Sequence, residues 1–110
     1  MSVFAVTTAK GANWDRSRGI RQQPFWDEHA VFADRLVDSG VIIFGGPIDS
    51  ENDEDIALLA VETSDKSTLR SIFDADPWTV NQIFRIKDIR LWTLWLDGRS
   101  CAAPASAPEF

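Results

Sequence analysis

Residues 41–61 read VIIFGGPIDSENDEDIALLAV, and this stretch decides the fold. Two apolar runs, Val41–Phe44 and Ile56–Val61, flank an acidic segment, Asp49–Asp55. Apolar runs of this length, bounded by glycine, proline and charged residues, are typical of strands. We therefore predict a hairpin with a solvated acidic tip. Because neither run alternates apolar with polar residues, we expect both faces of the sheet to be buried.

One strand and one helix are predicted before the hairpin, and a second helix after it. Residues Val3–Thr8 are rich in β-branched and aromatic side chains, which favours a strand. The first helix is expected to begin near Pro24, because proline suits the first helical position, and to end at Gly40. The second helix has Thr63 or Ser64 as its candidate cap. The apolar stripes of the two helices comprise Phe25, Phe32, Ala33, Leu36 and Val37 in the first, and Leu69, Ile72 and Phe73 in the second.

The last part of the chain predicts a short helix and a final strand. Asp76 and Pro77 resemble a helix cap followed by a first-turn proline, which would open a short helix over Trp78–Phe84. The final strand is predicted over Ile86–Leu96. The resulting order, β-α-β-β-α-β, is the split pattern of an α+β, ferredoxin-like fold with a four-stranded antiparallel sheet.

This architecture predicts a homodimer. Two helices cover one face of the sheet, and the other face also needs a cover, since Trp92 and Trp95 are expected on opposite faces of the last strand. A second copy of the sheet would bury about 2,000 Å² or more. The alternative is a monomer whose own tail folds over the sheet. We expect residues 1–96 to form one domain and the Ala-, Ser- and Pro-rich residues 97–110 to form a flexible tail.

Composition narrows the class of protein. The 110 residues hold 11 basic and 17 acidic side chains, a formal charge of −6, which disfavours nucleic acid and anionic membranes as partners. The N-terminus lacks the pattern of a targeting segment, and no apolar stretch approaches the length of a membrane span. The single cysteine, Cys101, predicts a reducing cytoplasm. No cofactor is indicated.

His29 and Asp76 are the candidate catalytic residues. His29, the only histidine, lies four residues after Phe25 and three before Phe32, and so belongs to the apolar stripe of the first helix. It is either a general acid/base or an ordinary histidine at the edge of that stripe. Asp76 is either a simple helix cap or a carboxylate that orients His29. The two interpretations of Asp76 are compatible, because one oxygen can cap while the other faces the imidazole.

Residues 9–22 form a long loop with two glycines and three arginines. Arg16, Arg18 and Arg21 either clamp an acidic ligand or remain solvated. The acidic segment 49–55 lacks the glycine and glutamate spacing of a calcium loop. One cysteine and one histidine, far apart, predict no metal site. Gly45 and Gly46 are no phosphate loop, because no helix follows them directly.

The order of these motifs resembles the YCII-related (YciI-like) family of the dimeric α+β barrel group. The likeness covers about residues 2–96 and rests on His29, the FGGP segment at 44–47, the ADPW segment at 75–78 and the RLW segment at 90–92. It implies a ferredoxin-like homodimer whose sheets pack face to face. It also implies a pocket lined by His29 and Asp76, which have been proposed as an acid/base pair in the family.

Most members of that family have no assigned reaction, while a few relatives degrade aromatic compounds, including by dehalogenation. This sequence departs from the family pattern in its longer, arginine-rich loop and in Trp78, where phenylalanine is more common. Both changes would reshape a pocket, so a relative's substrate does not transfer.

The leading functional hypothesis is a lyase- or isomerase-like enzyme acting on a small organic acid, aromatic acids included. His29 would move the proton, Asp76 would orient it, and Trp14, Arg21 and Trp78 would shape or close the pocket. The alternatives are a non-catalytic module that binds a small ligand or serves as an accessory subunit, and a structural dimer without a ligand.

Overall fold

The computed structural model describes residues 1–98 of the chain, and those residues form an α+β domain. Its elements follow the predicted order, with one further 3₁₀ turn, η1, in the long loop. They are β1 (Ser2–Lys10), η1 (Ile20–Gln22), α1 (Trp26–Asp38), β2 (Ile42–Pro47), β3 (Asp55–Thr63), α2 (Lys66–Phe73), α3 (Pro77–Val80) and β4 (Phe84–Leu91).

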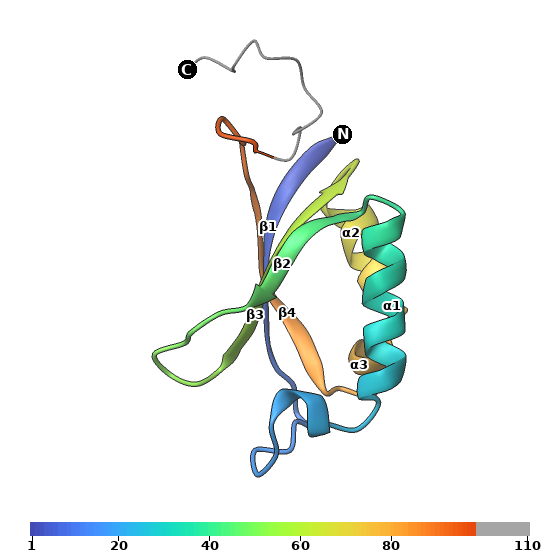
Figure 1. The fold of residues 1–110 in the computed structure, drawn as a ribbon, viewed down its shortest axis with the longest axis vertical. Coiled ribbons are helices and arrows are strands. Elements are labelled where there is room, and N and C mark those ends of the chain that lie inside the picture. The colour runs from blue at the N-terminus through green and yellow to red at the C-terminus, as the bar shows by residue number, and fades with distance from the viewer. Residues whose placement is uncertain (99–110) are drawn as a thin grey trace.

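The four strands form one antiparallel sheet in the order β2-β3-β1-β4. The three α-helices of residues 1–98 all lie on one side of it, and none of them covers the other side (Figure 1). This is the predicted ferredoxin-like α+β fold with a four-stranded antiparallel sheet. No helix within residues 1–98 is long and apolar enough to cross a bilayer. The predicted tail falls outside the described residues from position 99 onward.

Helix α1 begins later than predicted. Pro24 is not its first residue; Phe25 occupies the cap position with φ of 63°, in the left-handed region, and the helix starts at Trp26. At the other end the prediction is confirmed, because Gly40 follows the helix with φ of 82°. The apolar stripe packs less tightly than expected: no residue of α1 is fully buried.

Helix α2 is capped by Asp65, and the prediction of Thr63 or Ser64 was wrong. The Asp65 carboxylate accepts a 2.7 Å hydrogen bond from the backbone N–H of Thr68. Thr63 is instead the last residue of β3. The hydrogen bond from the Thr68 backbone is the main reason that the pKa of Asp65 lies below its usual value.

The short helix and the last strand have different limits from those predicted. Helix α3 starts at Pro77 with Asp76 as its cap, as expected, but ends at Val80 rather than Phe84. The chain then turns through Gln82, which has φ of 57°, so β4 begins at Phe84 and ends at Leu91 instead of spanning Ile86–Leu96. The positive φ at Gln82 explains why the helical pattern could not continue.

Two hydrophobic clusters form the core between the helices and the sheet. The first joins α2 to the central strands and includes Phe4, Val6, Ile42, Val61, Leu69, Phe73 and Ile89. The second lies under α3, beside the loop, and consists of Ile56, Trp78, Ile83 and Phe84, with Trp14, Ile20, Trp26 and Ala57 packed against it. The candidate site lies at this second cluster.

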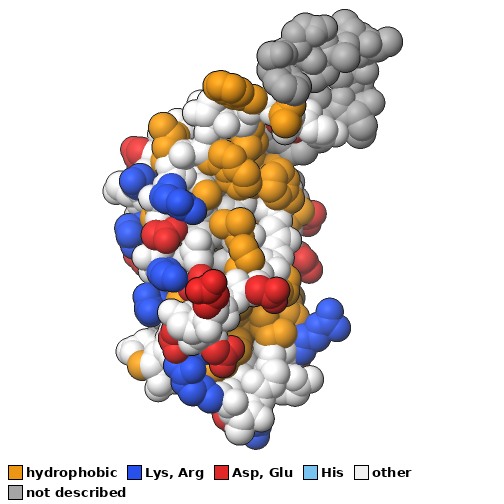
Figure 2. Space-filling model, turned by 90° about the vertical axis from the view of Figure 1, so that its left-hand side faces the viewer, with side chains coloured by type: hydrophobic (Ala, Val, Ile, Leu, Met, Phe, Trp, Pro, Cys, Tyr) orange, Lys and Arg blue, Asp and Glu red, His pale blue; other side chains and the backbone are white. Residues whose placement is uncertain are grey.

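The side of the sheet without helices carries an apolar strip, seen in orange along the middle of Figure 2. The ring of Trp92, which follows β4, lies 6.1 Å edge-on from that of Phe44 on β2. Because β3 and β1 separate these strands, the two rings must reach toward each other and meet above the central strands. This accounts for the burial of Ala5 and Ala60, which stand opposite each other on this face.

The sequence pattern placed Trp95 within the last strand, and this prediction was wrong. Strand β4 ends at Leu91, and the Trp95 side chain is 73% exposed.

Candidate active site

His29 of α1 contacts Asp76, the cap residue of α3, 47 positions later in the chain. The Nδ1 atom of His29 lies 2.8 Å from Oδ2 and 3.0 Å from Oδ1 of Asp76. The Asp76 side chain is only 1% exposed, and that of His29 is 16% exposed. A buried carboxylate needs partners of this kind, because leaving it unpaired in the interior is costly.

Asp76 both caps α3 and faces His29, the two roles considered from the sequence. Its Oδ1 atom accepts a 2.9 Å hydrogen bond from the backbone N–H of Trp78, which caps α3. The same carboxylate faces the imidazole of His29. The cap holds the carboxylate in one position, and the carboxylate in turn holds the ring.

Aromatic rings hold the other sides of the imidazole. The ring of Trp78 stacks on it, with centroids 3.9 Å apart and planes 1° apart. Phe84 approaches edge-on at 5.2 Å, and Trp26 lies tilted at 5.8 Å. Trp78 is itself fully buried, and its indole N–H donates a 2.8 Å hydrogen bond to the carbonyl of Pro24. The imidazole is thus fixed in both position and plane.

These contacts define the roles of the two imidazole nitrogens. A carboxylate only accepts hydrogen bonds, so Nδ1 must carry a proton and donate it toward Asp76. The neutral ring therefore keeps its lone pair on Nε2, which makes no hydrogen bond to any residue between 1 and 98. A histidine held in this tautomer can accept a proton at Nε2.

A cavity of about 370 Å³ opens beside the pair, within the size range of small-molecule sites. Its walls come from α1, β2, β3, η1 and the region of α3. Thr8 also lines it, at a point where the register of β1 shifts against both neighbouring strands. The lining residues most important here are Thr8, Ile20, Trp26, His29, Phe32, Ala33, Val37, Ile42, Pro47, Ile56, Asp76, Trp78 and Phe84.

The three predicted substrate-binding residues lie in different places. Trp78 lines the cavity. Trp14 does not line it, but supports Trp78 from behind with an edge-on contact of 5.7 Å. Arg21 is exposed on η1 and is absent from the wall, although its neighbour Ile20 is part of it.

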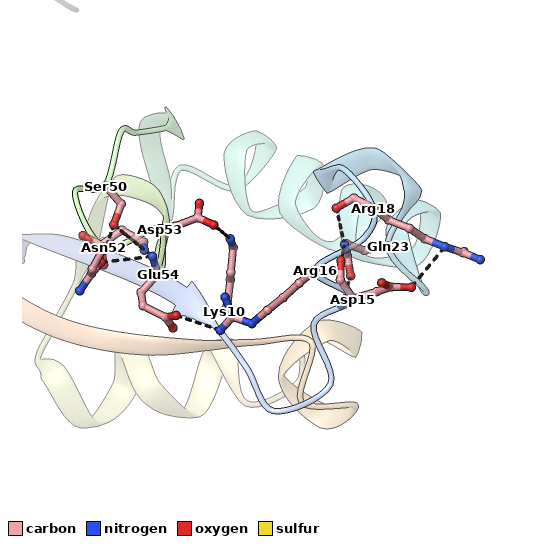
Figure 3. Close-up of polar contacts among 10 residues, drawn as sticks. Lys10, Asp15, Arg16, Arg18, Gln23, Ser50, Asn52, Asp53 and Glu54 are labelled. Carbon is pink, nitrogen blue, oxygen red and sulfur yellow. Dashed lines mark hydrogen bonds and ion pairs between the residues drawn. The ribbon is translucent and has the colours of Figure 1, made fainter.

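The arginine-rich loop is pinned to the hairpin tip, as Figure 3 shows. Arg16 pairs with Glu54 at 2.8 Å, and Lys10 pairs with Asp53 at 3.1 Å. Arg18 pairs within the loop with Asp15, whose pKa is lowered mainly by a hydrogen bond from the Ser17 hydroxyl. The acidic tip is therefore tied to the loop rather than simply solvated.

Sequence reasoning missed three residues of this region. Trp26 lies three positions before His29, so its place on the same helix face was available from the spacing. Phe84 was assigned to a helix, and its role depends on the turn at Gln82. Gln23 is 3% exposed; its side chain accepts from the N–H of Asp15 and donates to the Asp15 carbonyl, both at 2.8 Å. A lone glutamine carries no pattern that could have revealed this.

Fold and site together define a ferredoxin-like α+β domain with a histidine–aspartate pair at the end of an apolar cavity. No family model matches the chain, and no curated protein matches it, so membership of the YCII-related family stays a prediction.

Among solved structures, the chain is similar to a 5-chloro-2-hydroxyhydroquinone dehydrochlorinase from Burkholderia phenoliruptrix AC1100, in complex with 2,5-dihydroxybenzoquinone. The identity is 18%, the TM-score is 0.49, and the match covers 84% of this chain and 92% of that one. A likeness this distant tells us nothing about function.

Proposed function

We propose that this protein is an acid/base enzyme, lyase- or isomerase-like, that moves a proton on a small organic molecule. The observation that carries the proposal is the contact of His29 Nδ1 with both oxygens of Asp76, beside the cavity. Such a pair, with one nitrogen held and the other left as a base, is suited to general acid/base catalysis.

In the proposed step, Nε2 of His29 takes a proton from a C–H or O–H group of the substrate. The bond electrons remain on the substrate as a carbanion or oxyanion, and the ring becomes an imidazolium. The cation is stabilised by the Asp76 carboxylate and by the face of Trp78. The proton then returns to another substrate atom in an isomerisation, or to the leaving group in an elimination.

Trp78 would form one wall for the substrate, and Trp14 would hold Trp78 in place. Arg21 would pair with the carboxylate of an acidic substrate. It makes no ion pair among residues 1–98, unlike Arg16 and Arg18. Because Arg21 is outside the cavity wall, its use requires a ligand that extends to the loop.

The second candidate function is a non-catalytic module that binds a small ligand, and it is favoured by the largely apolar wall of the cavity. The two functions differ in one property. An enzyme needs the basic Nε2 atom of His29, whereas a binding module needs only the shape of the cavity.

We also propose that the protein works as a homodimer, with the apolar side of the sheet facing a second copy. Phe44 supports this, since 46% of it remains exposed at the edge of the strip even though Trp92 covers the centre. Exposed apolar strips of this kind mark interaction surfaces.

The test is solvent exchange. Small organic acids, ketones, lactones and phenols are incubated with the protein in D₂O, and loss of C–H signals is followed by NMR. For a responsive compound, we expect His29→Gln and Asp76→Asn to slow exchange by about 10²–10⁴-fold. Asparagine also caps helices well, so Asp76→Asn should fold with nearly unchanged stability.

The matched control is Asp74→Asn, two residues away and exposed, which should leave the exchange rate unchanged. Binding of a compound without exchange, or exchange that survives His29→Gln, would contradict the enzyme proposal. The first result would favour the binding module.

A further inference from the structure

Helix α1 packs only loosely on the sheet. It has an apolar stripe, yet none of its residues is fully buried. The stripe residues His29, Phe32, Ala33 and Val37 instead line the cavity. The eight positions from His29 to Val37 correspond to about 12 Å along the helix axis. The cavity therefore runs under α1 for roughly two turns beyond the catalytic pair.

The opposite wall has a similar length. All six residues of β2, from Ile42 to Pro47, line the cavity, and such a strand spans roughly 17 Å. Strand β2 is an edge of the sheet. The lining residue Val37 of α1 is 51% exposed, so the cavity opens on this side, between α1 and β2.

The walls carry little charge. Among the described lining residues, the ionisable side chains are His29 and Asp76, which pair with each other, and no lysine or arginine contributes. A carboxylate placed here would lose its water without gaining a cation, and it would face the Asp76 carboxylate. A neutral apolar group meets no such penalty and gains from burial.

From this geometry we propose that the substrate is an uncharged molecule with two parts. A ring bearing a weakly acidic hydroxyl or C–H lies at His29, between Trp26 and Phe84, and an apolar chain or second ring extends under α1 toward Val37. The assignment of chemistry to the His29 end rests on the proposed acid/base function. The preference for a neutral, elongated ligand rests on the cavity alone.

Ala33 is the residue that keeps the cavity continuous. It lies midway between His29 and Val37, four positions from each, so a large side chain there would divide the cavity. Val31 offers a matched control, because it is on the same helix, is half-exposed and does not line the cavity.

The experiment measures binding by tryptophan fluorescence, for which Trp26 and Trp78 are reporters. The probes are phenol, 4-methyl-, 4-ethyl- and 4-propylphenol, with 3-(4-hydroxyphenyl)propanoate as the charged counterpart of the longest. We expect affinity to rise about fourfold per added methylene, because each buried methylene contributes a nearly constant free energy. The propanoate should bind at least about tenfold more weakly than 4-propylphenol, since the cavity offers its charge no partner.

Ala33→Phe should abolish the dependence on chain length while phenol itself still binds, which also shows that the variant is folded. Ala33→Leu should reduce the dependence, and Val31→Phe should leave it unchanged. Equal affinity along the alkyl series in the natural protein would overturn the proposal. So would propanoate binding that is as tight as that of 4-propylphenol and is lost in Arg21→Ala.

The two proposals fail separately. His29→Gln should retain the chain-length dependence, whereas it should lose proton exchange. Exchange that survives His29→Gln would contradict the acid/base function but not the preference for a neutral, elongated ligand. Equal affinity along the alkyl series would contradict that ligand preference but not the acid/base function.

Discussion

At the scale of single residues, Trp78 connects the parts of the candidate site. Its ring stacks on His29, its backbone N–H is held by Asp76, and its indole N–H reaches the Pro24 carbonyl just before α1. One buried side chain thus joins the start of α1 to the start of α3. The separation of His29 and Asp76 depends on this junction, because each residue is anchored at one of these two helix starts.

Trp78→Phe should destabilise the fold by about 2–3 kcal/mol. The change removes buried volume and leaves the Pro24 carbonyl without its donor. Urea unfolding followed by circular dichroism measures the loss. Trp95→Phe is the control, and it should change stability by less than about 0.5 kcal/mol because that side chain is exposed. Equal effects in the two variants would mean that the junction is unimportant.

At the scale of elements, a buried glutamine holds the loop before α1 in addition to the ion pairs of its arginines. The Gln23 side-chain amide faces the carbonyls of Asp15, Arg18 and Gly19. This holds the loop in a closed turn and places Ile20 on the cavity wall. The left-handed Phe25 that follows redirects the chain into α1, a conformation that is uncommon outside glycine and often stored near functional sites.

Gln23→Ala should loosen the loop, because several buried backbone groups lose their partner at once. We expect a destabilisation of about 2–3 kcal/mol and faster tryptic cleavage after Arg16, Arg18 or Arg21. Limited proteolysis with mass spectrometry identifies the cleaved bonds. Gln22→Ala, at the exposed neighbouring position, should be cleaved at the natural rate. A Gln23→Ala protein as resistant as the natural one would show that the ion pairs alone order the loop.

The cap of α2 predicts a pH effect with a definite sign. Because the pKa of Asp65 is lowered in the folded chain, its contribution is present above the ordinary carboxyl range and is lost as pH falls through the folded pKa. Asp65→Ala should therefore lower Tm at pH 7, and the difference from the natural protein should shrink toward zero in acid. Thermal unfolding across this range measures it.

Ser64→Ala serves as the comparison for the cap, since within residues 1–98 the Ser64 hydroxyl bonds only the Thr68 hydroxyl and no backbone N–H. It should show little change in Tm at any pH. If Ser64→Ala lowered Tm as much as Asp65→Ala, Ser64, a cap candidate from the sequence pattern, would be as important for the start of α2 as Asp65.

At the scale of the whole molecule, the sheet has one side covered by helices and one side with an apolar strip (Figures 1 and 2). Trp92 covers the small residues Ala5 and Ala60 at the centre of that strip. The chain thus supplies part of its own cover, and the apolar surface left for the proposed second copy includes Phe44, which is 46% exposed.

Phe44→Glu should convert the proposed dimer to a monomer, because a dimer would bury this charge without a partner. Light scattering after gel filtration should give twice the 12.3 kDa chain mass for the natural protein and a single chain mass for the variant. Val31→Glu, a half-exposed residue of α1 away from the strip, should remain a dimer. A natural protein that stays at 12.3 kDa at micromolar concentration would rule out the dimer.

Local patterns in the sequence determined the order of the elements. The hairpin of 41–61, the left-handed Gly40 and the cap at Asp76 all follow from interactions within a few residues, so the pattern contains them. The ferredoxin-like topology follows from that order, because few arrangements of these elements are possible. Even His29 and Asp76 could be singled out as candidates by their positions on elements.

Tertiary structure alone decided how these pieces meet. The 2.8 Å contact of His29 with Asp76 joins positions 47 apart, and the stacking of Trp78 on His29 is also a contact between separate segments. The early end of β4 and the contact between Trp92 and Phe44 above the sheet depend on packing, which no local sequence period records. The elements come from short-range chemistry, whereas the cavity is the space that α1 leaves when it packs on the sheet, and only the assembled fold defines that space.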